Sequence, residues 1–377
     1  MIKVDDKSMC CGCAACVQRC PKQCIAMEAD GEGFLYPLVD TDKCIDCGLC
    51  EKVCPMLNRG EERVPLHTYA ARCTDEDIRR DSSSGGVFSV LAGQVLAGGG
   101  VVFGARFDDD WRVVHDCCTT LEGHAAFRGS KYVQSCIGDC YLRAETFLKE
   151  GRRVLFSGTP CQIAGLRRFL RREYDNLLTV EVACHGVPSP LVWRRYLEEL
   201  HSPCDIKRIA FRDKSTGWKN FSFLLSWGAG AICERFYDNT FMKPFLANFS
   251  LRPSCYNCKA KACSSGADIL LADLWGAQLI VGSDDDDKGM SLVAVNKEVL
   301  LSTDKLWLRE IEYSEAVKYN SAIVKSVPWN KKRDEFFIKF ANGESIAGIV
   351  GELMRVPIAQ RALGFLKRVV KKIIGRK

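Results

Sequence analysis

Eight cysteines near the start of the chain stand in two groups with the same spacing. Each group reads C-x2-C-x2-C-x3-C and is followed by a proline, Pro21 in the first group and Pro55 in the second. This is the bacterial pattern for two 4Fe-4S clusters, in which the last cysteine of each group binds the other group's cluster. We therefore expect one cluster on Cys10, Cys13, Cys16 and Cys54, and a second on Cys44, Cys47, Cys50 and Cys20.

Other uses of the 22 cysteines fit the sequence less well. Zinc also binds four thiolates, but zinc sites rarely show a third cysteine at this spacing together with a Cys-Pro pair. Disulfides are typical of short secreted chains, whereas this chain has 377 residues and no apolar signal-peptide segment after Met1. Its uncharged apolar runs are also far shorter than the ~20 residues of a membrane-spanning helix. We expect a cytoplasmic protein whose cysteines bind metal.

Four later cysteines can form a third site with four thiolates. They are Cys161, Cys184, Cys255 and Cys258. Cys161 follows a tight turn after a predicted strand, and Cys184 ends the next predicted strand. Neighbouring parallel strands end at the same edge of a sheet, so these two side chains can meet the C-x2-C pair there. From spacing alone, ordinary buried cysteines remain an open alternative, and Cys263 is a rival fourth ligand.

The elements expected around these cysteines alternate between strands and helices. Strands are expected at 69–71, 101–105, 153–157 and 178–183, and helices at 87–96, 137–150, 162–172 and 191–201. Such alternation is typical of a parallel or mixed sheet covered by helices. From 207 to 237 the pattern changes to strands, most clearly at 208–211 and 221–227.

Six short segments recur together, in this order, in one protein family. They are Ser83-Ser84-Gly85-Gly86-Val87, Ser130-Lys131-Tyr132-Val133-Gln134-Ser135, Ser157-Gly158-Thr159-Pro160-Cys161-Gln162, Cys184-His185-Gly186-Val187-Pro188-Ser189, Phe211-Arg212-Asp213-Lys214 and Cys255-Tyr256-Asn257-Cys258. With them the chain resembles the coenzyme F-420 hydrogenase/dehydrogenase beta-subunit family, in its bacterial form with a fused N-terminal 2x(4Fe-4S) ferredoxin domain. The resemblance covers about residues 5–340.

The resemblance implies an FAD- and iron-sulfur-dependent oxidoreductase. In this family FAD lies in the body beside a 4Fe-4S cluster, which favours a third cluster on Cys161, Cys184, Cys255 and Cys258. Relatives move electrons between clusters and a hydride carrier, such as coenzyme F-420, or an organic substrate. Bacterial members often lie among genes for surface polysaccharides. The alternative is a non-catalytic electron-transfer subunit that docks on a partner oxidoreductase.

The resemblance also implies which residues contact the cofactor. They are Ser83, Ser84, Gly85, Gly86, Ser130, Lys131, Gln134, Gly158, Thr159 and Pro160. A Ser-Gly-Gly turn that opens a helix can bind a pyrophosphate through backbone N–H groups, although a simple helix cap has the same sequence.

Lys131 and His185 are the candidate catalytic residues. Lys131 can contact a phosphate or the flavin ring, or it can be a surface lysine. His185 can donate a proton to substrate, or it can donate a hydrogen bond to a cluster sulfur.

The expected fold class is α+β or α/β, with a ferredoxin-like two-cluster module followed by a mixed-sheet α/β flavoprotein body. We expect a ferredoxin domain at 1–58, an N-terminal flavoprotein (beta-subunit) domain at 66–205, a C-terminal beta-subunit domain with cluster ligands at 206–340, and a basic amphipathic tail at 341–377. The expected partners are an electron-donor protein or hydride carrier and a small-molecule substrate.

The net charge of +6 is unevenly distributed. Residues 352–377 contain eight Lys/Arg and one acidic residue, so the rest of the chain has a net charge of −1 and is not a basic nucleic-acid-binding surface. Asp284–Asp287 is expected to be a solvated acidic loop.

The tail contains an apolar stripe flanked by basic residues. Leu363, Leu366, Val369, Val370, Ile373 and Ile374 recur every three or four residues. A basic amphipathic helix of this kind binds anionic membrane surfaces, which would place the protein on the inner face of the membrane. A helix packed on the body is the alternative.

Overall fold

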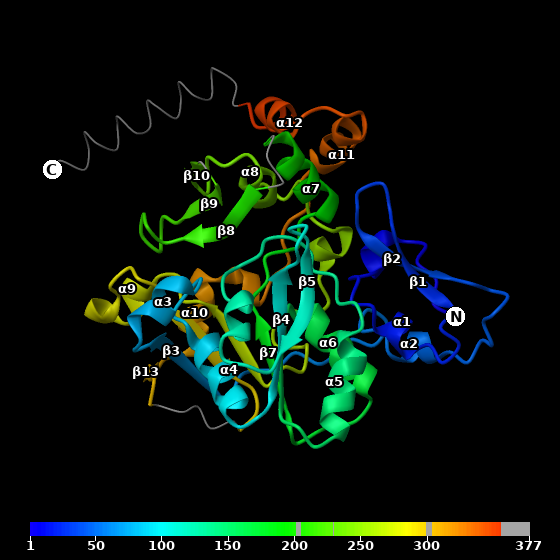
Figure 1. The fold of residues 1–377 in the computed structure, drawn as a ribbon, viewed down its shortest axis with the longest axis horizontal. Helices are drawn as coiled ribbons and strands as arrows, with labels where there is room; N and C mark the ends of the chain where they lie inside the picture. The colour runs from blue at the N-terminus through cyan, green and yellow to red at the C-terminus, as the bar shows by residue number, and fades with distance from the viewer. Residues whose placement is uncertain (201–204, 229, 299–303, 356–377) are drawn as a thin grey trace.

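An eight-stranded mixed sheet forms the centre of the protein (Figure 1). The computed structural model describes residues 1–200, 205–228, 230–298 and 304–355. The strands are β3 (His67–Cys73), β4 (Val101–Phe107), β5 (Val113–Cys118), β6 (Val154–Gly158), β7 (Leu177–Val182), β11 (Ile269–Asp273), β12 (Ser291–Val295) and β13 (Leu306–Glu310). Their order across the sheet is β13-β3-β12-β11-β7-β6-β4-β5.

The four strands β4, β6, β7 and β11 are parallel and lie inside the sheet. The segments Val101–Phe103 and Val154–Phe156 are fully buried. Continuous runs of β-branched and aromatic residues are typical of strands that are covered on both faces. Because these strands are parallel, their carboxyl ends meet at one edge of the sheet, which is where ligands bind in α/β proteins.

Helices cover both faces of the sheet. On one face, α4 (Val87–Ala97) packs against Val102 and Leu155. On the other face, α5 (Cys140–Lys149) and α6 (Pro160–Leu170) pack against Phe103 and Phe156. The helices α3 (Glu76–Asp81), α9 (Ala277–Ile280) and α10 (Tyr313–Tyr319) lie near β3 and β13 (Figure 1).

A three-stranded antiparallel sheet lies above the central sheet in Figure 1. It consists of β8 (Ile206–Asp213), β9 (Ser222–Trp227) and β10 (Gly230–Arg235). It packs with α7 (Pro190–Glu199), α8 (Met242–Leu246), α11 (Arg333–Ala341) and α12 (Ile346–Leu353). Their shared core is rich in aromatic residues, including Trp193, Phe211 and Phe241.

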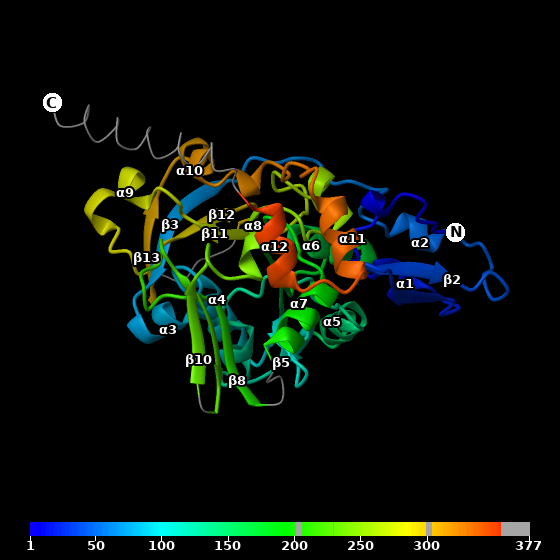
Figure 2. The same ribbon diagram turned by 90° about the horizontal axis from the view of Figure 1, so that it is seen from above.

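The N-terminal module, residues 1–58, contains α1 (Ala15–Arg19), β1 (Ile25–Ala29), β2 (Leu35–Val39) and α2 (Leu49–Lys52). Both views place it at one end of the molecule, beside α5 and α6 (Figure 1 and Figure 2). Its Cys13 and Ala15 share a hydrophobic core with Tyr141 and Leu166 of the body. A Cβ atom on Gly165 would lie 2.9 Å from Cys13 Cβ. The module is therefore packed tightly on the body.

The strands and helices expected in the body are confirmed, because each overlaps an observed element. The expected domain boundary lies between residues 205 and 206, but the central sheet takes strands from both sides of it. β12 and β11 lie between β3 and β7, and β13 lies at the edge beside β3. Within the described part of the chain, no helix is both long and apolar enough to cross a membrane. The apolar stripe of the tail, residues 363–374, lies outside the described residues.

Candidate functional site

The N-terminal module arranges its eight candidate ligands around two small cavities. The first cluster site is lined by Cys10, Cys13, Cys16 and Cys54. The second cluster site is lined by Cys20, Cys44, Cys47 and Cys50. Each cavity thus receives three cysteines of one sequence group and the last cysteine of the other, which is the arrangement that the spacing predicts.

A third small cavity lies in the body. We call this cavity the third cluster site, because it is lined by the four cysteines expected to bind a third cluster, Cys161, Cys184, Cys255 and Cys258. Cys161 lies in the first turn of α6, directly after β6, and Cys184 stands two residues beyond the end of β7. The two parallel strands therefore deliver these thiols to the same edge of the sheet. The rival ligand Cys263 is buried and does not line this cavity.

Two buried cations flank the third cluster site. Arg252 is fully buried and Lys261 is 6% exposed, and both side chains line the cavity. Lys261 Nζ donates hydrogen bonds to two carbonyl oxygens, those of Cys184 and Ala322. Among the described residues, neither cation has a carboxylate within ion-pair distance. A buried positive charge is costly unless a negative group balances it, and a cluster with four thiolates is such a group.

The candidate ligands are not gathered around a single point. In the part of the chain that the structure describes, no three His, Cys, Asp or Glu side chains are close enough to bind one ion. Zinc requires four ligand atoms at about 2.0–2.3 Å from a single point. A 4Fe-4S cluster instead distributes its thiolates over four iron atoms, so its ligands stand farther apart.

A larger cavity of about 300 Å³, called the large cavity below, opens at the carboxyl edge of the sheet. Its walls are the ends of β6, β7 and β11, the Ser82–Gly86 turn, the Arg128–Val133 segment and Arg212 of the second sheet. Pockets for small molecules and cofactors have volumes of roughly 300–1,000 Å³. The large cavity is therefore the candidate site for an organic cofactor or substrate.

The large cavity and the third cluster site share one wall. Residues Cys184, His185, Gly186 and Val187 line both cavities. This segment follows β7 directly, and a Cβ atom on Gly186 would lie 2.8 Å from Leu251. Because the wall is a single stretch of chain, a ligand in the large cavity would lie next to the third cluster site.

The Ser82–Gly86 turn is shaped by contacts with the sheet. Gly86 has a φ of 85° and precedes the first residue of α4, a conformation that glycine adopts without strain. A Cβ atom on Gly85 would lie 2.4 Å from the carbonyl oxygen of Ala71 in β3. Gly85 does not line the large cavity, so glycine is needed there for packing against β3. The residues of this turn that line the cavity are Ser82, Ser83, Ser84 and Gly86.

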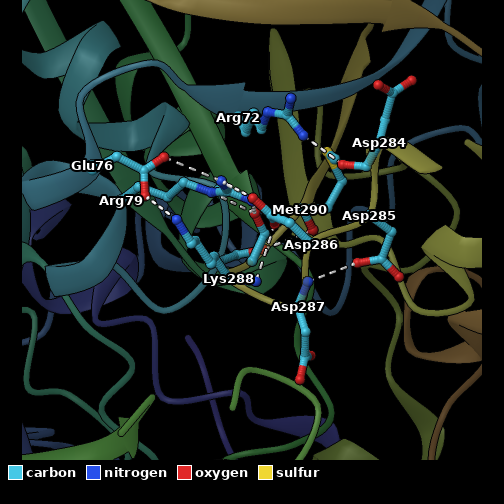
Figure 3. Close-up of polar contacts among 12 residues, drawn as sticks. Arg72, Glu76, Arg79, Asp284, Asp285, Asp286, Asp287, Lys288 and Met290 are labelled. Atoms are coloured by element: carbon cyan, nitrogen blue, oxygen red, sulfur yellow. Dashed lines mark hydrogen bonds and ion pairs between the residues drawn. The ribbon is translucent and has the colours of Figure 1, made fainter.

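The Asp284–Asp287 loop is only partly solvated, because several of its carboxylates form ion pairs with the body, and Figure 3 shows the pair between Asp286 and Arg79. Arg79 is 2% exposed and donates to both carboxylate oxygens of Asp286, at 2.7 and 2.5 Å. The side chain of Asp285 is 2% exposed and forms an ion pair of 2.6 Å with Lys219. The loop therefore fixes α3 and the Ser82–Gly86 turn that follows it. Sequence composition did not reveal these pairs because the partners lie far apart in the chain, 207 residues for Arg79 and Asp286 and 66 residues for Lys219 and Asp285.

Lys214 holds the same turn from the second sheet. Its Nζ donates to the carbonyl oxygens of Arg79 and Ser84, both at 2.7 Å, and of Lys288 at 2.9 Å. Burial lowers the pKa of Lys214 to about 7. Its three carbonyl partners tie the acidic loop, α3 and the cavity wall together.

Ser130 and Lys131 stand at the wall of the large cavity. The backbone N–H and the hydroxyl of Ser130 both donate to Ser83 Oγ, at 2.5 and 2.8 Å. Lys131 Nζ donates to the carbonyl oxygens of Arg128, at 2.9 Å, and Gly129, at 3.2 Å. Burial lowers the pKa of Lys131 to about 7. Lys131 is thus a half-buried lysine at the cavity and not a surface lysine.

Besides Gly85, two predicted cofactor residues do not line the large cavity, whereas Gly158 and Thr159 do. Gln134 joins the module to the body, because its amide donates to Cys11 O at 3.1 Å and accepts from Arg252 at 3.0 Å. Pro160 lines the third cluster site.

A buried histidine that sequence patterns did not single out supports the cavity floor. Burial lowers the pKa of His115 to about 4, so the ring is neutral near pH 7. His115 Nε2 bonds to the Ser157 carbonyl oxygen at 3.1 Å, and Ser135 Oγ bonds to Nδ1 at 2.9 Å. Gln162 donates to the same Ser135 hydroxyl at 2.9 Å. All four residues line the cavity, and the network fixes the side chains of His115, Ser135 and Gln162.

His185 stands in the shared wall with one ring nitrogen already engaged. Its Nε2 lies 2.7 Å from Asn248 Oδ1, and its ring meets Phe245 edge-on at 5.2 Å between centroids. Nearby, Arg212 forms an ion pair of 2.5 Å with Asp273, and both residues line the large cavity. These groups form the polar end of the cavity next to the third cluster site.

Three models of protein families match the chain. Residues 151–316 match the model for the C terminus of the beta subunit of coenzyme F420 hydrogenase/dehydrogenase. Residues 68–138 match the model for the N-terminal part of the same protein. Residues 9–57 match a 4Fe-4S dicluster domain.

Curated relatives match the N-terminal module. A ferredoxin named Ferredoxin 7Fe from Hydrogenibacillus schlegelii is 51% identical over 43 residues, which are 11% of this chain and 49% of that protein. A ferredoxin from Streptomyces griseus is 45% identical over 42 residues, 11% of this chain and 35% of that protein. The chain therefore spans between about a third and a half of the length of these relatives.

Among solved structures, a chain of the F420-reducing NiFe hydrogenase complex from Methanosarcina barkeri aligns with 68% of this chain and 90% of its own length, at 17% identity and a TM-score of 0.46. The matches to family models cover both parts of the body and the module before it. The chain thus belongs to the coenzyme F420 hydrogenase/dehydrogenase beta-subunit family and carries a 4Fe-4S dicluster ferredoxin domain ahead of the beta-subunit body.

Proposed function

We propose that this protein is an iron-sulfur flavoprotein oxidoreductase, with 4Fe-4S clusters at all three cluster sites and FAD in the large cavity. FAD supplies hydride chemistry toward a carrier such as coenzyme F-420, or toward an organic substrate, and exchanges single electrons with the clusters. The observation that carries the proposal is the wall formed by residues 184–187, which the third cluster site shares with the large cavity.

The residues at one end of the large cavity fit a pyrophosphate. No side chain caps the N-terminus of α4, and Gly86, Val87 and Phe88 of its first turn line the cavity. Uncapped backbone N–H groups at a helix N-terminus bind phosphate oxygens. Arg128 adds positive charge beside them, and Lys131, with its pKa lowered to about 7, is partly charged near pH 7. These groups, with Ser83 and Ser84, would hold the FAD pyrophosphate.

The opposite end of the cavity offers groups for a ring system and a substrate. His185 and Phe245 provide flat surfaces, while Arg212 and Asp273 provide charge. If His185 Nε2 carries the hydrogen of its bond to Asn248, Nδ1 is free to accept a hydrogen bond from a bound ligand. His185 at this end and Lys131 at the phosphate end are the candidate catalytic residues.

The third cluster is tested by iron content. Anaerobically reconstituted protein should hold about twelve iron atoms, four for each cluster. The variant Cys255→Ser, Cys258→Ser should hold about eight, whereas the control Cys263→Ser should keep about twelve because Cys263 does not line the site. If the double variant also keeps about twelve, the third cluster is not bound by these cysteines.

The flavin and its role are tested in the same preparations. One FAD per chain should be released on denaturation. Dithionite should bleach its absorption, and a small organic acceptor or coenzyme F-420 should restore it. A flavin that only a protein partner reoxidises would indicate an electron-transfer subunit. Reconstituted protein that binds no flavin would refute the proposal.

A further inference from the structure

Arg252 lies between the N-terminal module and the body and is fully buried. Its Nε donates to the carbonyl oxygen of Cys10 at 2.7 Å, and its Nη2 donates to the carbonyl oxygen of Leu35 at 2.9 Å. Nη1 donates to Gln134 Oε1 at 3.0 Å. Nη2 also lies 3.5 Å from Cys10 Sγ, a candidate ligand at the first cluster site.

The positive charge of Arg252 has no carboxylate partner among the residues that the structure describes. Its guanidinium lies 4.2 Å from the centroid of the Tyr36 ring, and its other close partners are neutral groups and Cys10. By contrast, the buried arginines Arg79 and Arg333 each form an ion pair with a carboxylate. Since a buried cation without a counter-charge is costly, the negative charge that balances Arg252 must come from the cluster sites.

Arg252 belongs to both neighbouring sites at once. It contacts Cys10 at the first cluster site and lines the third cluster site. Cys11 and Met56 line both of these cavities, so only a thin layer of residues separates them. The second cluster site shares no lining residue with the third. The first cluster site is therefore the one that faces the body.

We propose that Arg252 is a shared cation that raises the reduction potentials of the clusters at the first and third sites, and that the first cluster is the one that exchanges electrons with the body. A fixed positive charge favours the reduced cluster, which carries one more negative charge, and burial strengthens the interaction. The inference rests on the proposed function, because it requires the third cluster.

The test is a potentiometric titration of the anaerobic holoprotein, followed by electron paramagnetic resonance. Comparison with the variant Cys255→Ser, Cys258→Ser assigns the signal of the third cluster. In Arg252→Gln the potentials of the first and third clusters should fall, while that of the second cluster should stay unchanged. In Arg252→Lys, which keeps the charge, both should stay close to the unmodified values.

Arg333→Gln is the matched control. Arg333 is 3% exposed and also joins the module to the body, through Glu32, but it lines none of the three cluster sites. Its replacement should shift no potential. A shift of the same size in Arg252→Gln and Arg333→Gln would show that docking, and not charge, sets the potentials, and would overturn the inference.

Iron content separates the two possible failures. About eight iron atoms in the unmodified protein would overturn the third cluster and with it the proposed function. About twelve iron atoms, with unshifted potentials in Arg252→Gln, would overturn the role of Arg252 alone. If Arg252→Gln does not retain its clusters, the test rests on Arg252→Lys. This variant keeps the positive charge, so a fall in the potentials of the first and third clusters would contradict the inference.

Discussion

The ion pair between Arg79 and Asp286 predicts that Asp286 contributes far more to the stability of the fold than Asp284 of the same loop does. In Asp286→Asn the buried guanidinium of Arg79 loses its carboxylate and keeps the Gly289 carbonyl oxygen and a 3.5 Å ion pair with Glu76. Removing one partner of a fully buried pair costs ~3–5 kcal/mol, and removing one of an exposed pair costs ~0–1 kcal/mol. The side chain of Asp286 is 36% exposed and that of Arg79 is 2% exposed, so we expect a loss of about 2 kcal/mol.

The matched control is Asp284→Asn in the same loop. Asp284 pairs with the half-exposed Arg309 at 3.4 Å, and its own side chain is 38% exposed, so its replacement should cost less than about 1 kcal/mol. Chemical unfolding of both variants under anaerobic conditions gives the loss in free energy of unfolding for each. If FAD binds in the large cavity as proposed, Asp286→Asn should also weaken its binding, because Arg79 and Lys214 hold the Ser82–Gly86 turn.

The pH dependence gives a second check on this pair. Burial alone would raise the pKa of Asp286, but the hydrogen bonds and charge of Arg79 outweigh it and hold the pKa below the usual value of 3.8. A lowered carboxylate pKa stabilises the folded state above pH 3.8, and this contribution is lost as the pH falls further. The difference between the unmodified protein and Asp286→Asn should therefore shrink below pH 3.8. If the two aspartate variants are equally stable at pH 7, the loop is a solvated surface loop and the reasoning is wrong.

Three further predictions concern other parts of the molecule. His115 is neutral in the fold, with a pKa of about 4 against 6.5 when unfolded, so the unmodified protein should lose ~2 kcal/mol relative to His115→Gln between pH 6.5 and pH 5 in equilibrium unfolding. Gly85→Ala should destabilise by ~1–3 kcal/mol in thermal unfolding, whereas Gly351→Ala, with no atom within 4 Å of the added Cβ, should be neutral or slightly stabilising. The full chain should co-sediment with anionic liposomes at low salt but not at high salt, and a chain ending at Leu353 should not; sedimentation that salt does not affect would exclude the electrostatic attachment.

Short-range patterns predicted the parts of the protein that depend on local chemistry. The spacing of the cysteines predicted which of them meet at the first and second cluster sites, because a tight loop determines where its thiols point. Buried strands such as β6 and β7 were predictable from their apolar runs, and so was the position of Cys161 and Cys184 at their ends. Each of these inferences used residues that are close in the sequence or the general rule that parallel strands end at one edge.

The contacts that hold the sites together were not predictable from the sequence. Arg252 reaches Cys10 across 242 residues, and Arg333 reaches Glu32 across 301 residues. A single sequence contains no signal for such pairs, since each arginine by itself has the pattern of a surface residue. Gly85 shows the opposite case. The Ser-Gly-Gly pattern was recognised, but the structure assigns its first glycine to packing against β3.

The depth of the three cluster sites has a consequence for handling the protein in air. Cys47 at the second cluster site is exposed, whereas none of the candidate ligands at the first and third sites is exposed. Dioxygen and peroxide attack accessible iron and sulfur first. The second cluster should therefore be the first to break down during aerobic purification. Preparations made in air would then lose the iron of this most exposed site first.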